Sequence, residues 1–130
     1  MLWAGPLFTQ SGFIGGWFDP ASGEEGEGPP HDDALEGLIL PPFRNCHAHL
    51  GDTLARGEAP DASLAELVGP GGFKHRWLKE ADVAGSIATG LREAAASGTA
   101  LLLDFREGGE AGLAQLAQGA ADAGWGVEEG

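Results

Sequence analysis

Two histidines separated by one residue, His47 and His49, are the side chains of this sequence best suited to metal chemistry. They belong to the segment 43–50, which we interpret as a β-strand. Side chains alternate between the faces of a strand, so both imidazoles project from one face, about 7 Å apart at the backbone, and can converge on one ion. Neutral imidazole binds zinc, iron and nickel, and a catalytic ion keeps a position for a water whose pKa it lowers. The bare pattern alone favours the alternative, a chance pair of strand histidines.

Four further polar residues could belong to such a site. Asp52 follows the histidine pair and either orients a ligand imidazole or hydrogen-bonds its own loop backbone. Asp104, Arg106 and Glu107 come at the end of an apolar strand, where they would contact a polar substrate or a metal ligand. An arginine–carboxylate cluster that satisfies only itself is at least as good an interpretation of these three residues.

Residues 74–79 contain the basic cluster of the sequence, formed by Lys74, His75, Arg76 and Lys79. We favour a solvated helix start for this cluster over an anion contact on a loop above the site. Cys46 lies between strand residues on the face opposite the two histidines, so we expect it to pack in the wall and not to bind metal. As the only cysteine, it excludes an internal disulfide and gives no sign of an oxidising compartment.

The elements around these residues alternate between strands and helices. Residues 99–105 are a nearly continuous apolar run, which is typical of a parallel strand buried on both faces. From Leu78 onward, apolar residues recur every three to five positions, which predicts an amphipathic helix that ends at Gly98. A second helix is predicted for 110–123. With the strand at 43–50, the order is the βαβα pattern of a parallel α/β sheet or barrel.

The first forty residues follow a different pattern. Aromatic and β-branched residues of segment 1–18 form short groups separated by Gly and Pro, which predicts a small β unit. Segment 21–33 combines glycines and prolines with five acidic residues, so we expect a mobile loop there: Glu24, Glu25, Glu27, Asp32 and Asp33. Residues 35–40 are apolar and predict one more strand.

Charge and composition exclude several classes of partner. The chain has 130 residues, 42% of them hydrophobic, so it can build a core. Its 20 acidic against 7 basic residues give a net charge of -13, which excludes nucleic acids and anionic membranes as partners. No run approaches the roughly 18 to 20 apolar residues of a membrane span, and the N-terminal residues lack the pattern of a signal peptide. We therefore expect a cytoplasmic protein.

Two segments resemble a known family. Residues 38–52, LILPPFRNCHAHLGD, are similar to the amidohydrolase signature, in which an apolar strand leaves a small N-terminal β-sandwich, passes a proline and enters the first barrel strand, which ends in His-x-His. Residues 101–109, LLLDFREGG, resemble the second barrel strand and its loop in a branch of that superfamily whose substrates are little defined. Together with the β-rich start, the resemblance covers most of the chain.

The resemblance implies an α/β fold, the N-terminal part of a (β/α)8 TIM-like barrel preceded by a small β-sandwich segment. Residues 1–40 would be the sandwich segment, with the acidic mobile loop at 21–33, and residues 41–130 the first two β/α units. His47 and His49 would be the first two ligands of a divalent metal ion, with zinc the leading choice. The implied reaction is hydrolysis of an amide, cyclic amide or amino C–N bond of a small molecule by metal-activated water.

In that family the remaining ligands come from later strands: a carboxylated lysine or a glutamate, histidines on two further strands, and an aspartate that also handles protons. A complete barrel needs on the order of 250 residues, so 130 residues can hold about two of its eight units. We therefore expect a truncated gene product, a split protein or an excerpt. The rival interpretations are a non-catalytic remnant and a subunit whose partner chain, or an oligomer, completes the barrel.

Overall fold

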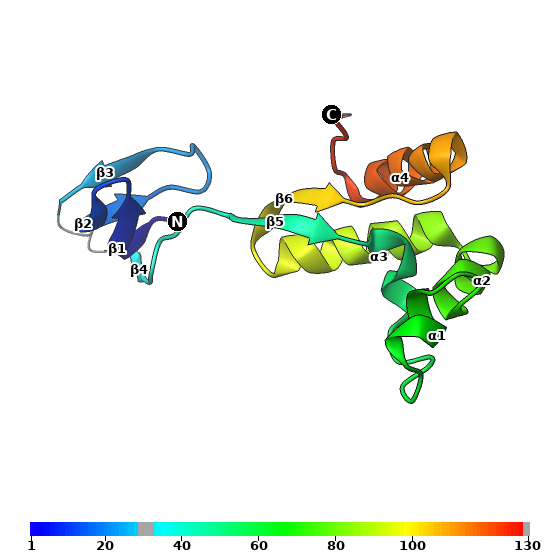
Figure 1. Cartoon of the computed structure of the whole chain (residues 1–130). Coiled ribbons are helices and arrows are strands. Elements are labelled where there is room, and N and C mark those ends of the chain that lie inside the picture. Colours follow the sequence, from blue (N-terminus) through cyan, green and yellow to red (C-terminus); the bar gives the residue numbers. More distant parts are fainter. Residues whose placement is uncertain (29–32, 129–130) are drawn as a thin grey trace. The chain divides into compact units, whose positions relative to one another are not determined.

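The computed structural model describes residues 1–28 and 33–128 and divides the chain into two compact units (Figure 1). The N-terminal unit comprises Met1–Pro42 and the C-terminal unit Phe43–Gly130. In the described part of the N-terminal unit, the regular secondary structure consists of strands only, whereas the C-terminal unit combines strands with helices. Among the described residues, no helix is long and apolar enough to cross a membrane.

The N-terminal unit is one four-stranded sheet in the order β3-β2-β1-β4. Strands β1 (Trp3–Thr9) and β2 (Gly12–Phe18) form an antiparallel hairpin, as the short apolar groups predicted. Strand β3 (Glu25–Glu27) adds to β2 in antiparallel orientation, and β4 (Leu35–Glu36) adds to β1 in parallel. The buried apolar residues of this sheet are few, namely Ala4 and Leu7.

Two expectations for this unit were wrong in part. The loop expected at 21–33 contains the strand β3, although residues 29–32 lie outside the described part of the chain. The pairing of β3 with β2 uses backbone groups and needs no apolar side chains. Gly26 allows β3 to lie directly against the Trp17 ring, because a Cβ at Gly26 would be only 2.8 Å from the indole Nε1. The strand expected at 35–40 pairs only at its start and again as a single bridge at Ile39.

In the C-terminal unit, β5 (Phe43–Ala48) and β6 (Thr99–Asp104) form a two-stranded parallel sheet. Helix α3 (Val83–Ala96) connects them and α4 (Gly109–Ala123) follows β6. The βαβα order predicted for this region is therefore observed, while closure into a barrel stays a prediction. One core cluster joins the helices to the start of the segment after β5: Leu50, Val83, Ile87, Leu91 and Ala120.

Three short helices lie between β5 and α3: η1 (Leu50–Ala55), α1 (Leu64–Val68) and α2 (Phe73–Glu80). The single helix predicted from Leu78 to Gly98 is in fact the end of α2 followed by α3. The break comes at Asp82, whose carboxylate caps α3 by accepting the backbone N–H of Gly85 at 2.9 Å.

Candidate metal centre

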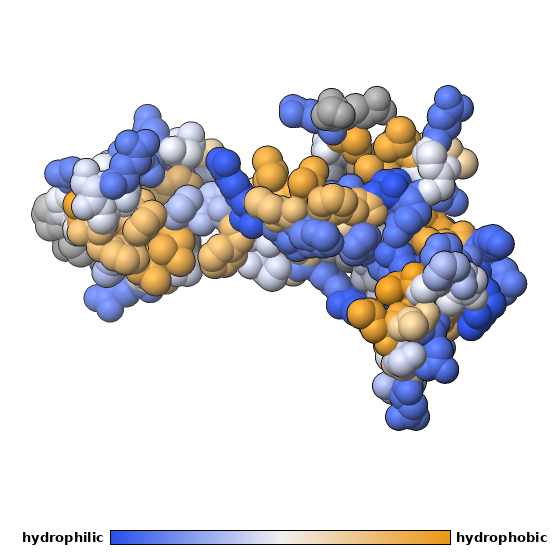
Figure 2. Space-filling model, viewed as in Figure 1, coloured by the Kyte–Doolittle hydropathy of each residue, from blue (hydrophilic) through white to orange (hydrophobic). Residues whose placement is uncertain are grey.

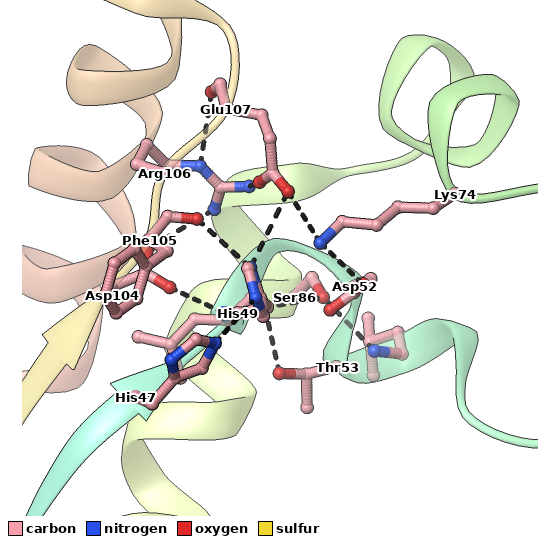
Figure 3. A network of polar contacts seen from close by, with 12 residues as sticks. His47, His49, Asp52, Thr53, Lys74, Ser86, Asp104, Phe105, Arg106 and Glu107 are labelled. Carbon is pink, nitrogen blue, oxygen red and sulfur yellow. Dashed lines mark hydrogen bonds and ion pairs between the residues drawn. The ribbon is translucent and has the colours of Figure 1, made fainter. Parts of the chain in front are cut away.

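His47 and His49 lie at the C-terminal end of β5 with their rings facing each other (Figure 3). Their Nε2 atoms are 3.2 Å apart, and the ring centroids are 5.1 Å apart. The Asn45 Oδ1 accepts the backbone N–H of His47 at 3.0 Å, which fixes the strand just before the pair. The His47 ring stacks on Phe105, 4.3 Å between centroids, at the end of the neighbouring strand. Both imidazoles therefore converge on one point.

The spacing of the two nitrogens suits a shared ion. Two imidazole nitrogens bound at about 2.0–2.1 Å to a tetrahedral zinc ion lie roughly 3.3 Å from each other. The observed 3.2 Å between the Nε2 atoms of His47 and His49 matches that value, and it also suits one hydrogen bond between the rings. Within the described residues, no group of three or more His, Cys, Asp and Glu side chains could hold a metal. The described residues therefore bring together two candidate ligands, His47 and His49.

The remaining ring nitrogen of His49 faces two acceptors. Its Nδ1 lies 3.2 Å from the backbone oxygen of Phe105 and 3.6 Å from Oε1 of Glu107. A carbonyl oxygen only accepts, so Nδ1 is the donor in this contact, and a neutral His49 then carries its lone pair on Nε2. A histidine that binds metal through Nε2 is held in this way by a carbonyl or carboxylate behind it.

Glu107 joins His49 to a wider polar network, which we define as His49, Asp52, Lys74, Asp104, Arg106 and Glu107. Lys74 Nζ lies 2.6 Å from Glu107 Oε1 and 3.2 Å from Asp52 Oδ2, and Arg106 Nη2 donates to Glu107 Oε2 at 2.9 Å. Burial raises the pKa of Glu107, but the hydrogen bond and charge of Lys74 and the charge of Arg106 outweigh it and leave the pKa below its usual value. The carboxylate beside His49 is therefore ionised at neutral pH.

Asp104 and Arg106 form the buried end of the network, each with a side chain only 5% exposed. Asp104 Oδ1 accepts the backbone N–H of Leu50, the residue after His49, at 2.8 Å. Its Oδ2 faces Arg106 Nη1 at 3.5 Å. The buried Ser86 holds the same turn from the helix side, since its hydroxyl donates to the Leu50 carbonyl at 3.2 Å.

The structure thus brings the polar residues singled out in the sequence into contact with one another. Asp104, Arg106 and Glu107 form a chain of ion pairs, but among the described residues the buried atoms Asp104 Oδ2 and Arg106 Nη1 have no hydrogen-bond partner, so the cluster satisfies itself only in part. Glu107 also contacts His49, and Asp104 contacts the residue after it. Asp52 contacts Lys74 and not an imidazole in any hydrogen bond or ion pair of the described residues.

Two expectations were wrong at this site. Lys74 is 12% exposed and reaches into the network, so the interpretation of its cluster as a solvated helix start fails for this residue. Its position beside Phe73 and Trp77 was the only hint in the sequence, and the pattern could not show which way the helix faces. Cys46 is exposed and does not pack in a wall, because packing against the helical core begins only at Ala48.

Comparison with known proteins finds relatives of this chain, but no family model and no solved structure matches it. The chain is 47% identical over 79 residues to a protein of Archaeoglobus fulgidus named "Putative aminohydrolase", a match that covers 58% of this chain and 24% of the relative. It is 31% identical over 116 residues to an uncharacterized protein of Methanocaldococcus jannaschii, covering 86% of this chain and 29% of the relative. It is also 41% identical over 54 residues to a 5'-deoxyadenosine deaminase of Methanococcoides burtonii, covering 42% and 12%.

The chain is therefore similar to proteins named for aminohydrolase or deaminase activity. It spans about a quarter of the length of the first two of these relatives. A match over 86% of the chain must include its central residues, among them His47 and His49.

Proposed function

We propose that this chain carries the first two metal ligands of a metal-dependent hydrolase of the amidohydrolase superfamily, which cleaves a C–N bond. The observation that carries the proposal is the pair of imidazoles, His47 and His49, whose Nε2 atoms lie 3.2 Å apart at the end of β5. The similarity to proteins named aminohydrolase and deaminase supports the reaction class.

In this proposal, His47 and His49 hold a divalent ion, with zinc the ion that two neutral imidazoles suit well. When bound, such an ion supplies a water of lowered pKa, able to act as a nucleophile near neutral pH. The residues of the chain prepare the ligands: the Phe105 carbonyl accepts a hydrogen bond from Nδ1 of His49, the Glu107 carboxylate lies 3.6 Å from the same nitrogen, and the Phe105 ring stacks against His47. The substrate is a small molecule with an amino, amide or cyclic amide group.

The fold supports the same assignment. We propose that residues 43–123 are the first two β/α units of a (β/α)8 barrel, because active sites of such barrels lie at the C-terminal ends of the strands, where His47, His49 and Glu107 gather. Two ligands alone bind a metal weakly, so further ligands would come from outside the described residues. The activity of the whole protein is therefore part of the proposal.

Zinc binding to the chain tests the ligand assignment. In equilibrium dialysis at a zinc concentration high enough to populate a weak two-ligand site, we expect the His47→Ala, His49→Ala double variant to bind less zinc than the unchanged chain. His75→Ala is the matched control, because it removes an imidazole from α2 outside the polar network and should leave zinc content unchanged. Circular dichroism shows whether the variants fold. Equal zinc in the double variant and the unchanged chain would refute the assignment.

A second candidate function has an observation of its own. The two-stranded sheet of β5 and β6 exposes large apolar side chains at its strands and directly after β6: Phe43, Leu101, Leu103 and Phe105. Figure 2 shows apolar atoms gathered along these strands. Unpaired strand edges and exposed apolar faces invite further chain to pack on them. A subunit of a split enzyme, completed by a partner chain or by an oligomer, would use this surface. Co-purification of a chain bearing the later strands supports this candidate, and a stable monomer without such a chain counts against it.

A further inference from the structure

The guanidinium of Arg106 occupies a place that only a glycine leaves free. Its side chain is 5% exposed and lies against the backbone of Gly51, two residues after His49. A Cβ at Gly51 would overlap the guanidinium nitrogens and come within 2.7 Å of Cζ. Gly51 does not adopt the left-handed conformation that favours glycine, so space for Arg106, and not backbone geometry, accounts for the glycine here.

From this position Arg106 faces two carboxylates: Glu107, which contacts the His49 ring, and Asp104, which contacts the backbone of the next residue, Leu50. Nη2 donates to Glu107 Oε2 at 2.9 Å, and the other oxygen of Glu107 lies 3.6 Å from His49 Nδ1. Nη1 lies 3.5 Å from Asp104 Oδ2, and the other oxygen of Asp104 accepts the N–H of Leu50 at 2.8 Å. One guanidinium thus hydrogen-bonds the carboxylate beside the ring of His49 and forms a longer ion pair with the carboxylate that anchors the backbone next to it.

The orientation and tautomer of His49 decide whether Nε2 can bind an ion. With the proton on Nδ1, the Nε2 lone pair faces His47; with the proton on Nε2, that position is blocked. The Phe105 carbonyl is one acceptor for the Nδ1 proton, and a negatively charged Glu107 favours the same form. Lys74 holds Glu107 from the opposite side, so the carboxylate has little freedom to turn away.

We propose that Arg106 is a positioning residue, which sets the Nδ1-protonated tautomer of His49 by holding Glu107 behind the ring and Asp104 behind the backbone. This inference rests on the proposed function, because it takes His49 as a metal ligand. Arg106 itself touches neither the ion nor the substrate in this scheme. Its action goes through Glu107, and Gly51 provides the room for it.

The tautomer can be measured without any metal. In the metal-free chain with 15N-labelled histidine, long-range 1H–15N correlation spectra distinguish Nδ1–H from Nε2–H for His49 at about pH 8, above the ordinary histidine pKa of about 6.5. We expect the Nδ1–H form to dominate in the unchanged chain. Gly51→Ala displaces the guanidinium while keeping every charged group, and Glu107→Gln removes the charge while keeping the shape. Both variants should raise the Nε2–H form to a comparable population.

Gly126→Ala is the matched control, because a Cβ at Gly126 meets nothing within 4 Å, and it should leave the tautomer of His49 unchanged. Zinc titration of the same proteins should show an affinity about 10–100-fold lower for Gly51→Ala and Glu107→Gln than for Gly126→Ala. If Gly51→Ala fails to fold, Arg106→Lys, which keeps the positive charge and removes the forked guanidinium, takes its place, and Glu107→Gln tests the carboxylate through which Arg106 acts. An unchanged Nδ1–H form in Glu107→Gln would overturn the inference, since the Phe105 carbonyl would then suffice. Two results together would refute the proposed function but not this inference: zinc binding that is unchanged in the His47→Ala, His49→Ala variant, and a shifted His49 tautomer in Glu107→Gln.

Discussion

Different interactions stabilise the interior of each of the two units. In the N-terminal unit, backbone pairing joins four strands that bury only two apolar side chains among the described residues, Ala4 and Leu7. In the C-terminal unit, two helices pack on a two-stranded sheet around a larger core that includes Ile87 and Leu91. The ion pairs of the described residues lie in the C-terminal unit, and most of them surround His49. The polar site therefore depends on a helical core, whereas the first unit depends on close contacts between backbone and rings.

Deleting part of the helical core should break this contrast most strongly. Ile87 is completely buried, and Ile87→Ala should lower the unfolding free energy of the C-terminal unit by about 2–5 kcal/mol, since it removes apolar contacts and leaves a cavity. Far-ultraviolet circular dichroism during chemical denaturation follows this unit, because all helices of the described residues belong to it. Leu64→Ala is the control: this side chain is 74% exposed, and the expected change is within about 0.5 kcal/mol. A loss no larger than that of the control would contradict the assigned core.

The corresponding weak point of the first unit is a glycine. Gly26→Ala should lower the stability of this unit by about 1–3 kcal/mol, because the new methyl group meets the ring of Trp17 and forces β3 or the indole to move. Tryptophan fluorescence during denaturation measures the effect. Gly15→Ala is the control, since a Cβ there meets nothing within 4 Å and the residue lies in the same sheet. Identical denaturation curves for the two variants would show that the ring contact contributes nothing.

Local patterns were sufficient to predict the elements that carry the site. The apolar run at 99–105 became β6, although Leu101 and Leu103 are exposed and the strand is not buried on both faces as predicted, and the helix predicted for 110–123 became α4 with one residue added. The Nε2 atoms of His47 and His49 lie 3.2 Å apart, as the same-face prediction required, although His49 follows the last residue of β5 and the register shifts between Asn45 and Ala48. Their role as metal ligands, like the barrel, stays a prediction.

Contacts between distant segments could not be predicted in the same way. Lys74 reaches Asp52 and Glu107 only because α2 folds back onto η1, and no sequence periodicity encodes that return. The strand β3 depends on Gly26 fitting against Trp17, although its acidic composition indicated a loop. In both places a tertiary contact outweighs the local preference.

The break between α2 and α3, which periodicity missed, sharpens the comparison within the C-terminal unit. Asp82→Ala should lower its stability by about 1 kcal/mol, because the N–H of Gly85 loses the carboxylate that caps α3. Asp82→Asn is the matched control and should retain most of the stability, since an asparagine oxygen caps equally well. Urea denaturation compares the three proteins. Equal losses in both variants would point to the charge of Asp82, and not to its cap, as the stabilising feature.

The smallest expected effect concerns α1, a helix of the C-terminal unit that buries no residue and so resembles neither core. The hydroxyl and the backbone N–H of Ser63 both donate to Glu66, and these hydrogen bonds lower the pKa of that carboxyl from its ordinary value of 4.5. Because the folded pKa is the lower one, the contribution of this contact is complete above the ordinary pKa and is lost as the pH falls through the lowered value. An NMR titration of the Glu66 carboxyl should therefore give a midpoint below that of the same residue in Ser63→Ala. Coinciding midpoints would show that the capping box does not form in solution. The Ser63→Ala substitution should leave the packing of the core and the contacts of the polar network unchanged.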